Sequence, residues 1–135
     1  MQVLNACDGK VHGALLIETG KGSFFIKNVT VAGDWIGVSD TENRVVVYSL
    51  SGRREVGRTF GSRASVGKSS GLLCVENESG QLTVYDIAST EKRDRFTFSG
   101  PVSLMQFSPD GKRLFELTAS QTAYVLDLSA AAPSL

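Results

Sequence analysis

Hydrophobic residues in this chain gather in short runs, and polar, turn-forming residues separate the runs. Val, Ile, Thr, Phe and Tyr make up the runs, while Gly, Asn, Asp and Ser break them. No window keeps apolar residues at the i, i+3, i+4 and i+7 spacing of an amphipathic helix through several turns. Runs of β-branched and aromatic residues bounded by turn residues are typical of strands. The pattern therefore predicts an all-β chain.

One four-residue pattern recurs along the chain at the end of a strand-like run. Its copies are Val47–Leu50, Val84–Ile87 and Val125–Leu128, and they begin 37 and 41 residues apart. A repeat of about 40 residues with several short strands is typical of a β-propeller blade, a four-stranded antiparallel sheet. The spacing predicts a partial propeller of about three to three and a half blades.

Aligning the repeats predicts the strands of each blade. We expect strands at 26–31, 35–39, 44–50 and 54–60, then at 64–68, 72–76, 82–87 and 93–98, then at 102–107, 113–118 and 122–128. The stretch before residue 26 is interpreted as a degraded copy, with strands at 3–6, 11–16 and 22–25. The predicted organisation is one partial propeller domain over 1–135, with a degraded blade 1–25, blades 26–61 and 62–100, an incomplete blade 101–129 and a tail 130–135.

The polarity of the runs agrees with this strand order. Residues 45–48 form a continuous apolar run, as expected of a strand that neighbouring blades cover on both faces. Residues 53–58 and 92–96 are rich in charge, as expected of outermost strands that face solvent.

Two segments resemble motifs of a known family. Phe107-Ser108-Pro109-Asp110-Gly111-Lys112-Arg113-Leu114 resembles the inner-hairpin motif of WD-repeat and related bacterial propeller repeats, and Val84–Ile87 resembles the strand that ends in their Trp-Asp dipeptide. The resemblance covers roughly residues 24 to 129. No blade has the Trp-Asp pair or the Gly-His dipeptide, so the hydrogen-bond network of WD repeats is not carried over. The chain is similar to a divergent WD-repeat-like β-propeller family.

The strand count predicts a ring that one copy does not close. Propellers generally contain four to eight blades, and the last predicted blade stops after its third strand. In WD-repeat propellers the N-terminus often supplies that missing strand. An open ring leaves sheet edges and an apolar face in water. We therefore expect either the other half of a longer propeller or a homo-oligomer, such as a homodimer.

Charge and cysteine content limit the partners. Fourteen basic and fourteen acidic residues give a net charge of zero, so no overall field attracts nucleic acid or an anionic membrane. No apolar run reaches the roughly 18 residues of a membrane span. The two cysteines lack metal-binding spacing, which favours reduced thiols and a cytoplasmic location. We expect neither nucleic acid nor membrane as a partner.

Candidate catalytic motifs are weak. Gly67-Lys68-Ser69 resembles part of a phosphate-binding loop, but Ser62 stands where the first glycine is required and no helix pattern follows. His12 is the only histidine, so it has no second histidine with which to bind a metal. We expect no catalytic, cofactor-binding or metal-binding residue and no enzymatic activity.

The resemblance implies a non-enzymatic protein-interaction scaffold that binds a peptide or a partner domain through its loops. The loops from second to third strands and from fourth to first strands hold the candidate partner-binding residues Asp40, Glu42, Asn43, Ser62, Arg63, Glu78, Ser99 and Pro101. The alternative is a propeller enzyme or ligand-binding domain with a site in the central channel, for which the inner strands offer Lys27, Lys68 and Gln106. A third alternative is a structural half whose partner is the rest of the ring.

Overall fold

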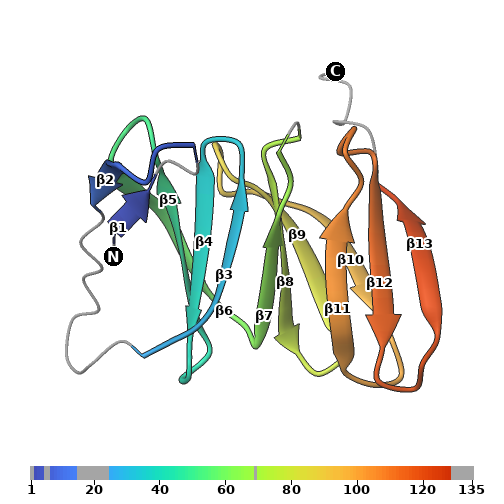
Figure 1. Cartoon of the computed structure of the whole chain (residues 1–135). Coiled ribbons are helices and arrows are strands. Elements are labelled where there is room, and N and C mark those ends of the chain that lie inside the picture. The colour runs from blue at the N-terminus through green and yellow to red at the C-terminus, as the bar shows by residue number, and fades with distance from the viewer. Residues whose placement is uncertain (1, 5–6, 15–24, 69, 129–135) are drawn as a thin grey trace.

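The computed structural model describes residues 2–4, 7–14, 25–68 and 70–128. Over these residues the chain forms strands β1 to β13 and no helix, which confirms the all-β prediction. The strands make four antiparallel sheets, and the three larger sheets stand side by side as blades (Figure 1). Each larger sheet follows the chain order of its strands, so neighbouring strands are joined by hairpin loops.

The blades take their names from their order along the chain. The first blade contains β3 (Ile26–Ala32), β4 (Trp35–Asp40), β5 (Arg44–Ser49) and β6 (Arg54–Phe60). The second blade contains β7 (Arg63–Val66), β8 (Leu72–Glu78), β9 (Gln81–Asp86) and β10 (Lys92–Thr97). The third blade contains β11 (Val102–Phe107), β12 (Arg113–Thr118) and β13 (Ala123–Asp127).

Strands form where the repeat predicts them, and the differences lie at their ends. Strand β7 ends at Val66 rather than at Lys68, because the Gly67 nitrogen bonds the Leu72 carbonyl and closes the loop to β8. The N-terminal stretch holds a two-stranded sheet of β1 (Gln2–Leu4) and β2 (Val11–Ala14), and residues 5–6 and 15–16 of the strands predicted there lie outside the described residues. The strand predicted at 22–25 lies outside the described residues except for Phe25, which is not in a strand.

The repeated four-residue pattern occupies equivalent places in the three blades. Val47, Val84 and Val125 lie in the third strand of their sheets and pair in register with the second-strand residues Gly37, Cys74 and Phe115. Tyr48 and Tyr85 follow at the next position and pair with Ile36 and Leu73. The repeat in the sequence is therefore a repeat in the structure.

Hydrophobic cores lie between neighbouring blades. The first junction, between the first and second blades, buries Val45, Val47, Ala64, Val66, Leu73, Val75 and Ile87. The second junction, between the second and third blades, buries Leu72, Cys74, Leu82, Val84, Val102, Met105, Phe107 and Leu114. Strand β8 contributes alternate residues to both junctions, which explains why its residues 72–75 form a continuous apolar run.

Candidate protein-interaction surfaces

The predicted partner-binding loops gather at one end of the blades, the lower end in Figure 1. Backbone hydrogen bonds join them in series. The Gly61 nitrogen donates to the Asn43 carbonyl at 2.8 Å, and the Phe98 nitrogen donates to the Gly80 carbonyl at 2.8 Å. We call this surface the loop rim, and it comprises residues 40–43, 61–63, 77–80, 98–101 and 119–122.

A single buried carboxylate holds much of the loop rim together. Glu76 is only 2% exposed. Its Oε1 accepts a hydrogen bond from the Ser62 hydroxyl at 2.9 Å. Its Oε2 accepts from the backbone nitrogens of Gly80 at 2.9 Å and Val102 at 2.7 Å. Because these donors come from two loops and from the start of β11, Glu76 fixes these segments relative to one another.

Glu76 is absent from the predicted site residues, although the sequence carries a signal for it. It directly follows the apolar run 72–75, so it continues a buried strand rather than beginning a solvent-exposed turn. A carboxylate at such a position needs hydrogen-bond donors, because an isolated buried charge is costly. The Ser62 hydroxyl and the backbone nitrogens of Gly80 and Val102 supply those donors here.

Asp40 lies on the loop rim but does not face solvent. It is fully buried, and its Oδ1 accepts from the Arg44 nitrogen at 2.7 Å and the Glu42 nitrogen at 3.1 Å. Its Oδ2 accepts from the Arg44 guanidinium at 2.6 Å. Burial raises the pKa of Asp40, but the hydrogen bonds and the charge of Arg44 outweigh it and lower the pKa below its usual value. Asp40 therefore stabilises the turn between β4 and β5.

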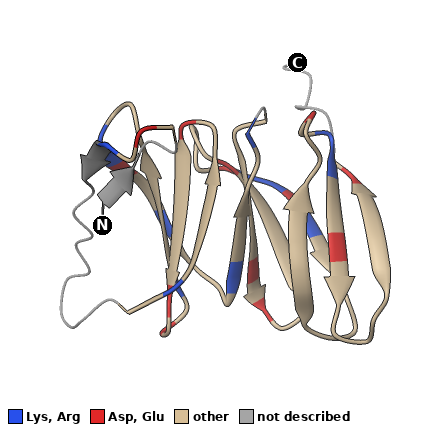
Figure 2. Ribbon diagram, viewed as in Figure 1, with Lys and Arg blue, Asp and Glu red and all other residues tan. Residues whose placement is uncertain are grey.

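The other predicted residues are available at the surface to different degrees. Ser62 is half-buried because its hydroxyl is bonded to Glu76, whereas six candidates are exposed: Glu42, Asn43, Arg63, Glu78, Ser99 and Pro101. Acidic and basic residues both occur along this end of the blades (Figure 2). The loop rim thus presents a mixed polar surface on a fixed backbone.

The third blade carries a second candidate surface on the face that points away from the second blade. Leu104, Phe115, Leu117 and Val125 are 55%, 43%, 37% and 57% exposed. Leu104 pairs with Leu117 and Phe115 pairs with Val125, so the four side chains share one side of the sheet. We call this surface the open face.

The same face is covered in the preceding blade. Cys74 and Val84 of the second blade occupy the register positions of Phe115 and Val125, and both are 0% exposed because the third blade packs over them. The third sheet also ends at β13, since no other strand in the described residues pairs with the outer edge of β13. Within the described residues, the open face and this edge therefore have no neighbouring blade or strand.

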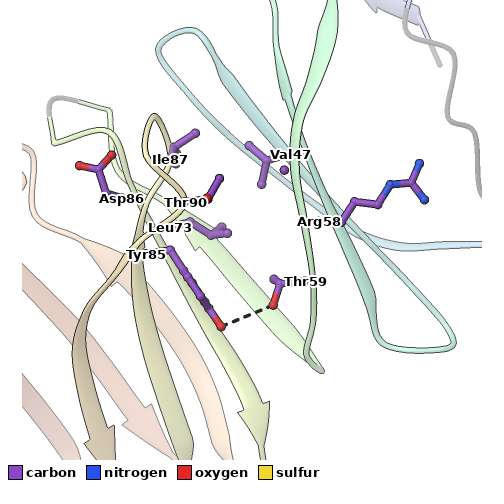
Figure 3. Close-up of a pocket in the computed structure, with 9 residues that line it drawn as sticks. Val47, Arg58, Thr59, Leu73, Tyr85, Asp86, Ile87 and Thr90 are labelled. Carbon is purple, nitrogen blue, oxygen red and sulfur yellow. Dashed lines mark hydrogen bonds between the residues drawn. The ribbon is translucent and has the colours of Figure 1, made fainter.

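A small crevice lies between the first and second blades, with a volume of about 420 Å³ that includes open solvent (Figure 3). Its apolar lining includes Leu73 and Ile87, and the Thr59 hydroxyl donates to the Tyr85 hydroxyl at 3.5 Å along the dashed line in Figure 3. Its charged groups are engaged elsewhere: Arg58 is paired with Glu55, and Asp86 accepts from the Ser89 nitrogen. The crevice therefore lacks a set of groups suited to catalysis.

The residues considered for a channel site do not converge. The Lys27 ammonium donates to the Ser62 carbonyl at 3.3 Å on the loop rim, whereas Lys68 lies in the β7–β8 loop at the opposite end of the blades. Gln106 is exposed on β11. Gly67 and Lys68 lie in the loop before β8, and no helix follows them in the described residues. Side-chain contacts of His12 lie outside the described part of the structure.

The described residues contain neither a metal-binding cluster nor a membrane-spanning helix. No group of three or more His, Cys, Asp or Glu side chains there is placed to hold a metal ion. In the same part of the chain, no helix has the length and apolar character needed to cross a membrane.

Comparisons with known proteins support the fold and leave the activity open. No family model matches the chain, and no curated protein matches it. Among 515 matching chains of solved structures is one from a crystal structure of the mitotic checkpoint complex, with a TM-score of 0.70 and 19% sequence identity. The alignment covers 92% of this chain and 39% of that one, so this chain spans about two fifths of the length of its structural neighbour. The likeness supports a WD-repeat-like fold built from partial β-propeller blades.

Proposed function

We propose that this chain is a non-enzymatic protein-interaction scaffold of WD-like blades, and that a second copy of the chain covers its third blade. The observation that carries the proposal is the open face. Four large apolar side chains lie there in register, while Cys74 and Val84, at the positions of Phe115 and Val125 in the preceding blade, are fully buried. Contiguous apolar surface of this kind marks an interaction site more often than free surface.

A second copy is a suitable occupant for physical reasons. Both junctions within the chain are blade-on-blade contacts, so a blade surface already fits a blade surface in this protein. The chain has no net charge, so two copies do not repel each other at long range. Covering apolar surface stabilises the contact by about 25 cal/mol per Å² removed from water. A symmetric dimer would bring two open faces together.

The exposed residues of the loop rim are the proposed contact surface for a peptide or partner domain. Glu76 fixes the backbone around these residues. This favours a binding role, since a pre-organised surface loses less conformational entropy on binding. The structural neighbour is itself part of a multi-protein complex. A cytoplasmic location is also a proposal, and it rests on the lack of a disulfide between Cys7 and Cys74.

Light scattering coupled to size-exclusion chromatography tests the second-copy proposal. We expect the mass of a dimer for the wild-type chain and the mass of a monomer for Phe115→Lys, because a buried unpaired charge is costly. The matched control is Phe60→Lys, which changes an exposed aromatic residue outside the open face and should remain dimeric. A wild-type chain that stays monomeric at high micromolar concentration overturns the proposal and favours the other half of a longer propeller.

A further inference from the structure

A buried carboxylate lies in the second junction. Glu116 is on β12 of the third blade and points toward the second blade. It is 3% exposed, and among the residues that the structure describes neither of its carboxylate oxygens has a hydrogen-bond partner. Ionising such a group in an apolar contact is costly unless donors or a cation compensate the charge.

The groups that face Glu116 do not compensate its charge. Strand β8 presents Glu76, whose carboxylate is held by three donors, and the buried thiol of Cys74. The register partners of Glu116 are Met105 on β11 and Tyr124 on β13, and neither supplies a positive charge. On β9, the buried hydrophobic residues of the junction are Leu82 and Val84, which carry no charge.

Burial is the main cause of the raised pKa of Glu116, and the negative charge of Glu76 adds to the shift. Together they raise the pKa of Glu116 from 4.5 to about 7. The same surroundings raise the pKa of the Cys74 thiol, first through burial and then through the charges of Glu116 and Glu76. Both shifts have the sign expected for a low-dielectric site that accumulates negative charge.

The first junction shows that the blade architecture does not require an acid at this position. The register places Val75 of the second blade where Glu116 stands in the third, and Ser39 of the first blade where Glu76 stands in the second. Val75 is 0% exposed and packs in the apolar core of the first junction. The facing carboxylates are therefore specific to the second junction.

We propose that the second junction is a proton-dependent contact, which is closed while Glu116 is neutral and is weakened when Glu116 loses its proton. The packing of the third blade, which carries the open face, against the second blade is then more stable at mildly acidic pH than at alkaline pH. The folded state binds the proton more tightly than the unfolded chain does. The stabilisation is therefore fully present below about pH 4.5 and is lost as the pH rises through about 7. The inference does not depend on self-association.

Chemical denaturation of the wild-type chain and of Glu116→Gln between pH 5 and pH 8 tests the proposal. Measured at one protein concentration, the unfolding equilibrium constant of the wild type should rise by about 70-fold more than that of the variant. Glutamine keeps the shape of the side chain and removes the titration, while every other titrating group is common to both proteins. If the unfolding equilibrium constants of the two proteins change by the same factor between pH 5 and pH 8, the proposal is overturned.

Two further measurements keep the test decisive if Glu116→Gln does not fold. In the wild-type chain, the ¹³C resonance of the Glu116 carboxyl should titrate with a midpoint near 7, and a midpoint near 4.5 overturns the proposal. In a Cys7→Ser background, alkylation of Cys74 reports opening of the junction. The control carries Glu116→Val, which introduces the residue that the second blade has at the equivalent position, Val75. The alkylation rate of the chain with Glu116, divided by the rate of this control, should rise with pH. A ratio that does not change with pH also overturns the proposal.

Discussion

The Oε2 atom of Glu76 accepts a hydrogen bond of 2.7 Å from the backbone nitrogen of Val102, which begins the first strand of the next blade. The same carboxylate bonds Ser62 and Gly80. The loop rim is thus organised from beneath by a side chain that solvent barely reaches.

Replacing Glu76 with alanine should destabilise the fold by about 3 kcal/mol, because the change leaves three donors without their acceptor. Urea denaturation measures the difference. The matched control is Glu78→Ala, which removes an exposed carboxylate from the same turn and should change the free energy of unfolding by less than about 0.5 kcal/mol. Equal effects of the two substitutions would contradict the role assigned to Glu76.

The loop rim also sets limits on two of its glycines. A Cβ atom at Gly61 would lie 2.2 Å from Val75 Cγ1 and 2.7 Å from the Glu76 carbonyl oxygen, whereas one at Gly100 would meet nothing within 4 Å. Gly61→Ala should therefore destabilise the fold by about 1–3 kcal/mol through overpacking. Gly100→Ala should be neutral or stabilise by up to about 1 kcal/mol. Thermal unfolding of both variants, side by side, checks the contrast.

Truncating a leucine in the second junction and a leucine on the open face should change the free energy of unfolding by different amounts. Leu82 is fully buried in the second junction, and Leu82→Ala should cost about 2–5 kcal/mol by leaving a cavity. Leu104 is 55% exposed on the open face, and Leu104→Ala should cost less than about 0.5 kcal/mol in the isolated chain. Denaturation at low protein concentration makes the comparison, and a large loss for Leu104→Ala would mean that the open face is covered within one chain.

Acid should weaken the turn between β4 and β5. The pKa of Asp40 is lower in the folded chain than its usual value of 3.8, so its contribution is present above that pH and is lost as the pH falls through the folded pKa. Asp40→Asn should therefore make stability less dependent on pH in the acid range. Denaturation of both proteins between pH 2 and pH 5 measures this, and identical slopes would show that Asp40 does not contribute.

Much of the architecture was predictable because it depends on local pattern. The alternation of apolar runs and turn residues located the strands, and the match between Tyr48 and Tyr85 gave the blade period. The charged outer strands followed from the need to keep sheet edges in solvent. Residues 45–48 could be interpreted as a buried strand because both of its faces are apolar.

The polar contacts between blades were not predictable in the same way. Whether Glu76 faces Glu116 depends on how two sheets 40 residues apart along the chain are packed, and no local pattern encodes that packing. Asp40 was expected at a surface loop, but the return of Arg44 over its carboxylate buries it. The predicted partner-binding residues do come together on the loop rim, and their binding role stays a prediction.

Strand β8 places Leu73 and Val75 in one hydrophobic core and Leu72 and Cys74 in the other. Two cores that share a strand are thermodynamically coupled, because unfolding of the shared strand removes packing residues from both. A substitution that destabilises the second blade is therefore expected to destabilise the first and third blades as well. Such a molecule gains cooperativity at the cost of modularity: blades at its ends can be exchanged more freely than the one at its centre.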